Sequence, residues 1–227
     1  MEMQKILNFL TELEQNNNKE WYHAHKKERL EAEKEFENLI QELILRIGEF
    51  DDSVLPFQPK DLTFKMVRDT RFSHDKSPYN PVFRAHISSK GKLPIPVGYF
   101  VYLQPQDRTF LGGGLFADMF TQATTLMRDY LSSNSEAFLK LIAEESFQKH
   151  FTVMGTQLKN VPKGYDKESP VAEYLKNKCW YLEYPVQDIE MSDSDRFIND
   201  AVEIFKAMVP FNTYLNTALK DFTMPER

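Results

Sequence analysis

The sequence predicts an α+β domain, in which a mainly antiparallel sheet of about five strands packs against N-terminal and C-terminal helices. Apolar residues recur at helical spacing near both ends of the chain, and runs with a period of two fill its middle. The regular alternation of strands and helices that builds a parallel sheet is missing. No linker divides the 227 residues, so we expect one domain over residues 1–227.

The chain is expected to begin with two helices. Ile6, Leu10 and Leu13 share one helical face, and the pattern stops at the asparagines of residues 16–18. Asn17 followed by Glu20 resembles a capping box for a long second helix, which Gly48 would end. The predicted buried stripe of that helix is Phe36, Ile40, Leu43, Ile44 and Ile47.

The middle of the chain is expected to supply the strands. Alternating apolar residues predict strands over residues 62–67 and 83–88, and residues 99–103 and 109–115 read as a hairpin closed by residues 105–108. A fifth strand is predicted over residues 179–184. Gly112, Gly113 and Gly114 lack the spacing of a phosphate-binding loop, so we expect them to allow close backbone packing.

Helices are predicted between and after these strands. Helical stripes cover residues 119–131 and 138–142, and a short helix at residues 171–177 follows a polar loop at residues 156–170. The capping sequence at residues 192–195 opens a C-terminal helical segment over residues 192–222. Pro210 is expected to stop or kink that segment.

Composition limits the class of protein. A hydrophobic content of 41% is too high for a disordered chain, and no run approaches the roughly eighteen apolar residues of a membrane span, so we predict no membrane association. The N-terminal residues lack the pattern of a signal peptide, and the single cysteine, Cys179, cannot form an intrachain disulfide. We therefore expect a cytoplasmic protein.

Charge is unevenly distributed along the chain. The net charge of −6 disfavours a protein that coats nucleic acid, although residues 59–92 hold eight Lys or Arg against three Asp. Within this basic stretch, residues 68–79 form the densest polar segment. Their guanidinium, ammonium and hydroxyl groups suit a phosphate or a carboxylate.

We predict that this segment, the polar face of the next strand and the loop at residues 156–170 line a cleft for a small anionic ligand, with phosphorylated compounds as the leading class. The candidate ligand-binding residues are Arg68, Asp69, Arg71, Lys76, Ser77, Tyr79, Arg84, His86, Lys163 and Tyr165. No motif assigns a reaction, a cofactor or a metal. If the site is catalytic, His86 or Asp69 would be its acid–base group.

Two alternatives remain open for residues 68–79. The segment could dock an acidic partner or a nucleic-acid backbone without catalysis, in which case binding would weaken steeply with salt. It could instead be structural, with Arg68 and Arg71 paired to Asp69 and Asp75. Asp69→Ala would then lower stability by a few kcal/mol, as the loss of a buried pair does.

Four segments carry a resemblance to a known family: Asn16, Asn17 and Trp21 near the start, residues 68–79, the Gly98–Tyr99 strand with its partner at residues 110–115, and residues 161–166. Together they resemble the uncharacterised family called domain of unknown function 2461, over about residues 6–184. The resemblance implies a conserved domain, and it implies no activity, cofactor or catalytic residue.

Overall fold

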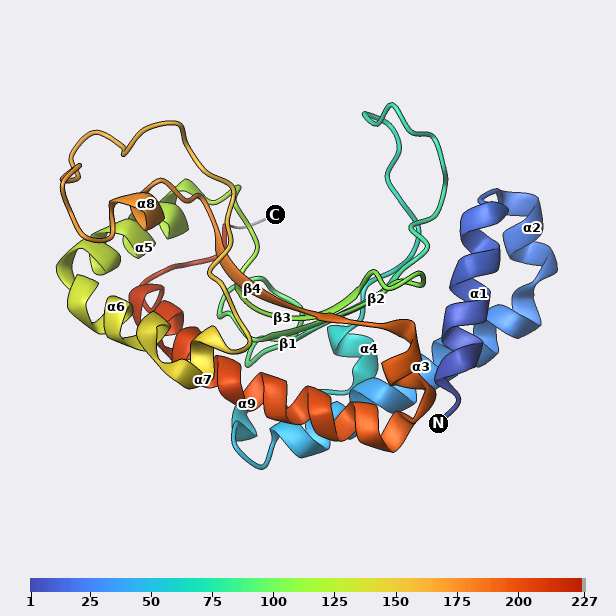
Figure 1. Cartoon of the computed structure of the whole chain (residues 1–227). Coiled ribbons are helices and arrows are strands. Elements are labelled where there is room, and N and C mark those ends of the chain that lie inside the picture. The colour runs from blue at the N-terminus through green and yellow to red at the C-terminus, as the bar shows by residue number, and fades with distance from the viewer. Residues whose placement is uncertain (226–227) are drawn as a thin grey trace.

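The computed structural model describes residues 1–225, which fold into an α+β arrangement with one antiparallel sheet (Figure 1). The strand order is β1-β2-β3-β4, so neighbours along the chain are neighbours in the sheet. Each of these strands starts within one residue of its predicted position. The strands are β1 (Phe83–Ile87), β2 (Tyr99–Leu103), β3 (Thr109–Leu115) and β4 (Trp180–Val186).

The sheet has four strands within the described residues, so the expectation of about five is wrong. The missing strand is the one predicted over residues 62–67. Pro59 and a capping box between Gln58 and Asp61 start a helical turn, α4 (Pro59–Leu62), which ends where that strand was predicted to begin. Beyond it, Thr63 and Val67 form only isolated bridges, to Ala85 and Tyr79. The alternating pattern is present, but no continuous ladder forms.

Helices precede the sheet, separate β3 from β4 and follow the sheet. They are α1 (Met3–Gln15), α2 (Lys19–Ala24), α3 (Lys26–Ile47), η1 (Asp52–Val54), α5 (Thr121–Ser133), α6 (Ser135–Ala143), α7 (Glu145–Gln148), α8 (Ala172–Leu175), η2 (Asp188–Ser192) and α9 (Ser194–Ala218). The predicted long second helix is therefore two helices, which meet at His25. None of the helices within residues 1–225 is long and apolar enough to cross a membrane.

Helices α3 and α9 cover one face of the sheet (Figure 1). Phe36 of α3 lies with its ring centroid 5.0 Å from that of Phe83, and Phe205 of α9 lies 5.3 Å from Tyr99. Pro210 lies inside α9 without stopping it. The buried residues Met208, Phe211 and Leu215 hold the helix on the core on both sides of the proline, which offsets the lost hydrogen bond.

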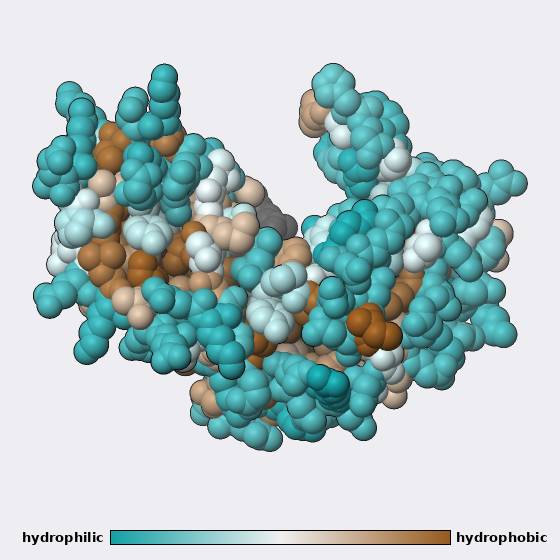
Figure 2. Space-filling view, viewed as in Figure 1, coloured by the Kyte–Doolittle hydropathy of each residue, from teal (hydrophilic) through white to brown (hydrophobic). Residues whose placement is uncertain are grey.

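Within residues 1–225, no helix covers the centre of the opposite face of the sheet in this way, and we call this face the open face (Figure 1). In Figure 1 it is the concave side, flanked by residues 68–79 on one side and by α5, α8 and the loop at residues 156–170 on the other. The space-filling view shows the surface hollowed between these two flanks (Figure 2). Partly exposed side chains on the open face therefore border this hollow.

Candidate functional site

Residues 68–79 form an arm that projects from the body of the protein (Figure 1). It starts where the Arg68 amide donates to the carbonyl of Pro78 at 2.9 Å and Val67 bridges Tyr79. Phe72, at its far end, is 95% exposed. The arm thus begins as a narrow ribbon and carries its charged residues outward into solvent.

The cations of the arm are paired within the arm itself. The Arg71 Nη2 donates to Asp69 Oδ2 at 2.6 Å, Arg68 donates to Asp75, and Lys76 Nζ donates to the Thr70 carbonyl at 3.0 Å. Hydrogen bonds from the Arg68 and Ser77 side chains hold the pKa of Asp75 well below its usual value, and the Arg71 guanidinium lowers that of Asp69. These head groups do not converge on a shared anion position.

Asp69→Ala is expected to leave the urea midpoint of unfolding unchanged. The side chains of Arg71 and Asp69 are 77% and 58% exposed, and exposed ion pairs contribute little because water screens them. The few kcal/mol expected for a buried pair therefore do not apply. A clear loss of stability in Asp69→Ala, measured against the unmutated chain at the same salt concentration, would contradict the exposed geometry.

Tyr79 closes the base of the arm and is buried. Its ring stacks on Tyr22 with centroids 3.8 Å apart. The Asn17 amide spans its backbone, donating to the Tyr79 carbonyl at 2.9 Å and accepting from the Tyr79 amide at 3.1 Å. Asn18, not Asn17, caps α2, accepting from the Trp21 amide at 2.9 Å. Asn17 and Tyr79 therefore fasten the arm to the helices.

The open face presents aromatic side chains from several strands. Residues opposite each other in the ladder share a face, which aligns Arg84 with Tyr102 and Tyr102 with Phe110 in one row. The next row holds His86, Phe100, Gly112 and Glu183. We call the partly exposed rings that meet here the aromatic cluster, which comprises Phe100, Tyr102, Phe110, Phe116 and Tyr181.

Close packing holds the rings of the aromatic cluster in place. Tyr102 and Phe110 stack with centroids 4.7 Å apart, and Phe116 stacks on Tyr181 at 4.5 Å. A Cβ on Gly112 would lie 2.8 Å from the Phe116 ring, so this glycine leaves the space that the ring occupies. A Cβ added to Gly113 would lie 2.8 Å from the Met208 sulfur, and one added to Gly114 would lie 2.5 Å from the Trp180 carbonyl oxygen. The three glycines lie within β3 and serve close packing.

Arg84 is a half-buried cation on the open face. Its guanidinium carbon lies 5.3 Å from the centroid of the Phe64 ring. None of the ion pairs or side-chain hydrogen bonds formed within residues 1–225 includes it. Burial lowers the pKa of Arg84, opposed by the phenol of Tyr102.

His86 lines a cavity of about 570 Å³ beside the aromatic cluster. Phe64, Phe100, Phe116 and Phe120 form much of its wall, and Lys92 also lines it. Burial lowers the pKa of His86 to about 4, and hydrogen bonding to the backbone of Leu93 and Lys92 only partly opposes this. The imidazole is therefore neutral at physiological pH and can offer a polar contact inside a mainly apolar cavity.

Glu183 is a carboxylate on the open face that the sequence analysis did not single out. Burial raises its pKa, and no ion pair within the described chain includes it. The aromatic cluster was also missed. The signal was present in β2 and β3, where Phe100, Tyr102 and Phe110 occupy the positions between the buried Tyr99, Val101 and Leu111, so both faces of these strands are apolar.

Lys163 and Tyr165 lie in the loop at residues 156–170, across the open face from the arm (Figure 1). The Tyr165 hydroxyl donates to Asp129 Oδ1 of α5 at 2.7 Å, and burial, followed by this contact, raises its pKa to about 12. Lys163 is exposed. The predicted site residues therefore divide into the arm, the sheet and this loop, and the fold does not gather them in one pocket.

Comparison with known families identifies the chain. The family model described as conserved hypothetical protein (DUF2461) matches residues 5–214. The chain belongs to the DUF2461 family. The match extends beyond the resembling segments at residues 6–184 and takes in most of α9.

Membership in DUF2461 covers every candidate site residue, since the arm, the open face and the loop all lie within residues 5–214. No curated protein and no solved structure matches the chain. The DUF2461 description states no activity, so function has to be argued from the side chains. No group of three or more His, Cys, Asp or Glu placed to hold a metal occurs within residues 1–225.

Proposed function

We propose that this protein binds a small organic anion on the open face of its sheet, with Arg84 as the anion-binding group and the aromatic cluster as the platform for the rest of the ligand. The observation that carries the proposal is the half-buried guanidinium of Arg84, which has no carboxylate partner within residues 1–225 and lies over the Phe64 ring at 5.3 Å.

An unpaired, partly dehydrated charge is costly to a fold, and a ligand anion would offset that cost. The guanidinium presents planar donors that match a phosphate or carboxylate through two parallel hydrogen bonds. The arm cations are less suited, because their own carboxylates already occupy them. We therefore assign the anion-binding position to Arg84 and not to residues 68–79.

The surroundings of Arg84 favour a ligand with a planar ring. Phe64 forms both the surface beneath Arg84 and part of the cavity wall, so the anion position and the cavity adjoin. The cavity volume of about 570 Å³ lies within the usual range for small-molecule sites. A ring would enter between the aromatic side chains, near the neutral His86, while its phosphate pairs with Arg84.

Titration calorimetry with three probes tests this proposal: adenosine monophosphate, adenosine and inorganic phosphate. Adenosine monophosphate should bind most tightly, because only it carries both ring and anion. Arg84→Met should weaken its binding about tenfold or more, the usual cost of losing a hydrogen bond to a charged group, and should leave adenosine unaffected.

Arg71→Met is the matched control, because it removes a guanidinium from the arm and leaves the open face intact. It should bind all three probes as the unmutated protein does. Equal affinity of Arg84→Met and the unmutated protein for adenosine monophosphate would overturn the proposal, and a loss confined to Arg71→Met would return the anion site to the arm.

A second candidate function is the docking of a nucleic-acid backbone or an acidic partner, which the basic residues on both flanks of the open face favour. Backbone binding releases counterions, so affinity for a single-stranded oligonucleotide would fall steeply between about 50 and 200 mM salt. Binding of a small anion in a partly dry cavity should respond much less. The salt series therefore separates the two functions.

We also propose that the protein is cytoplasmic. Cys179 is buried, with 2% exposure, and its sulfur accepts a hydrogen bond from the Thr156 amide at 3.2 Å. A chain with one thiol needs no oxidising compartment, which supports a cytoplasmic location.

A further inference from the structure

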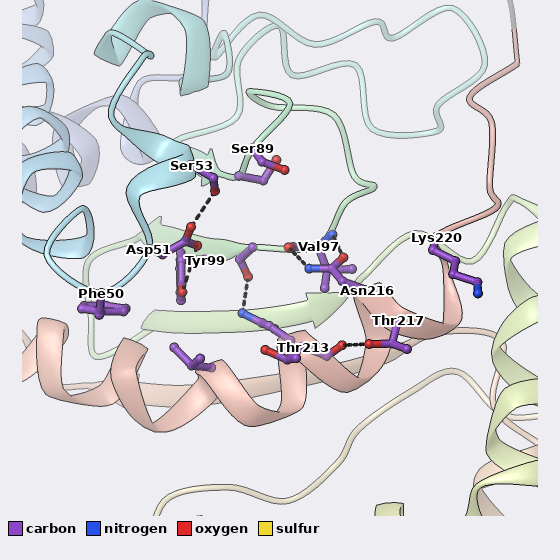
Figure 3. Close-up of a pocket in the computed structure, with 14 residues that line it drawn as sticks. Phe50, Asp51, Ser53, Ser89, Val97, Tyr99, Thr213, Asn216, Thr217 and Lys220 are labelled. Atoms are coloured by element: carbon purple, nitrogen blue, oxygen red, sulfur yellow. Dashed lines mark hydrogen bonds between the residues drawn. The ribbon is translucent and has the colours of Figure 1, made fainter.

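A second cavity lies on the α9 side of the sheet, away from the open face. It has a volume of about 600 Å³ and forms where the C-terminal half of α9 meets η1 and the connection between β1 and β2 (Figure 3). In contrast to the cavity beside His86, its walls carry mainly polar side chains. Among them are Asp51, Ser53, Ser89, Tyr99, Asn212, Thr213, Asn216 and Lys220.

Asp51 is a fixed carboxylate at one end of this cavity. It accepts hydrogen bonds from the Ser53 hydroxyl at 2.5 Å and from the Tyr99 hydroxyl at 3.2 Å. Burial raises the pKa of Tyr99, and the nearby Asp51 charge adds to this, so the phenol stays a donor. No cation pairs with Asp51 within residues 1–225, which leaves its charge uncompensated and its remaining lone pairs available.

Lys220 stands at the opposite end of the cavity (Figure 3). No ion pair formed by the described residues includes it. The two opposite charges are thus held apart on separate elements, Asp51 next to η1 and Lys220 just beyond α9, and neither neutralises the other.

The wall between these charges is rigid and polar. Asn216 is locked to the backbone of Val97, accepting from its amide at 2.8 Å and donating to its carbonyl at 3.0 Å. Asn212 donates to the Gly98 carbonyl at 3.1 Å, while its buried Oδ1 has no partner among the described residues. Thr213 and Ser89 add exposed hydroxyls. Polar groups along such a wall can form hydrogen bonds with ordered water or with the polar groups of a bound ligand.

We propose that this cavity is a second binding site, for a small extended zwitterion whose ammonium group pairs with Asp51 and whose carboxylate lies near Lys220. A carboxylate already oriented by two hydroxyl donors is a strong acceptor for an ammonium group, since a charge-assisted hydrogen bond is about twice as strong as a neutral one. The site shares no charged residue with the anion site at Arg84.

Three probes of matched carbon length test the assignment: 6-aminohexanoate, hexylamine and hexanoate. Binding is followed by amide chemical shifts, which should change near Asp51, Tyr99 and Asn216. The zwitterion should bind most tightly. Asp51→Asn should weaken binding of 6-aminohexanoate and hexylamine by about tenfold and leave hexanoate unchanged.

Lys220→Met should have the complementary effect, a loss of about threefold for 6-aminohexanoate and hexanoate with hexylamine unchanged, because an exposed cation contributes less. Asp52→Asn is the matched control, since this neighbouring carboxylate is exposed and lies outside the cavity lining. Asp52→Asn should bind all three probes as tightly as the unmutated protein does.

Equal affinity for all three probes, or shift changes confined to the open face, would overturn the proposal. If Asp51→Asn does not fold, the ranking of the three probes on the unmutated protein and on Lys220→Met still decides it. Failure here would leave the anion site at Arg84 untouched, because the two experiments use different probes and different variants.

Discussion

Gly114→Ala is expected to lower the free energy of unfolding by about 3–5 kcal/mol, which combines backbone strain with a steric clash. Gly114 has a φ of +92°, a conformation that L side chains rarely adopt. An added Cβ would also lie 2.5 Å from the Trp180 carbonyl oxygen and 2.8 Å from the Phe211 ring. The carbonyl belongs to the β3–β4 ladder and cannot move without breaking it. Urea unfolding followed by far-UV circular dichroism measures the loss.

Gly164→Ala is the matched control for this effect. Gly164 has a φ of +100°, but nothing lies within 4 Å of the added Cβ, so only the strain remains, at about 1–2 kcal/mol. Both substitutions reduce the entropy of the unfolded chain equally, and that contribution cancels in the comparison. Equal losses in the two variants would show that the contact with Trp180 contributes nothing.

Acidification from about pH 7 to about pH 4.5 is expected to cost the unmutated protein roughly 2–3 kcal/mol through His86 alone, given 1.36 kcal/mol for each pKa unit. The pKa of His86 is lowered from 6.5 to about 4 by burial. Between these two values the unfolded chain binds a proton that the folded chain does not, so stability falls as the pH falls. Below about 4 the folded state is protonated as well, and this contribution stops growing.

Other groups titrate in the same range, so the His86 contribution is measured as a difference between proteins. His86→Gln stays neutral at both pH values and should lose less stability on acidification than the unmutated protein. His23→Gln provides the control, since His23 is exposed and its removal should leave the pH dependence intact. If His86→Gln and the unmutated protein lose the same free energy, the imidazole is not dehydrated in the fold.

The two cavities proposed as binding sites differ in chemistry. One is lined by aromatic rings and adjoins Arg84 through Phe64, and the other combines a carboxylate with hydroxyls and a lysine. They lie on opposite sides of the sheet: Gly98 and Tyr99 line the polar cavity, and the next residue, Phe100, lines the aromatic one. Alternation along β2 therefore turns neighbouring residues toward different sites.

Sequence patterns were reliable where a single periodicity decided the structure. The stripe of α3, the hairpin of β2 and β3 and the cap of α9 at Asp193 all follow from local spacing. Residues 62–67 failed because alternation shows which side chains are buried and not whether a neighbouring strand offers hydrogen bonds. Thr63 and Val67 form one isolated bridge each, so residues 62–67 do not form a continuous strand.

Local sequence placed the candidate residues on their elements, but it did not show which of their charges are paired. Local composition correctly marked Arg84 and His86 as polar positions on one strand face, yet it gave equal weight to Arg71 and Lys76, whose charges are engaged within the arm. Pairing of this kind depends on how the chain turns between residues 69 and 76. Composition carries no information about that turn.

Short-range periodicity and motifs were enough to predict the α+β class, the family and the strand on which Arg84 lies. The pairing of charges, the choice of the open face and the contact of Asp51 with Tyr99, 48 positions away in the chain, could be seen only in the folded protein. Charge compensation and burial depend on contacts between distant segments. Those contacts exist only after the helices have covered one face of the sheet and left the other exposed.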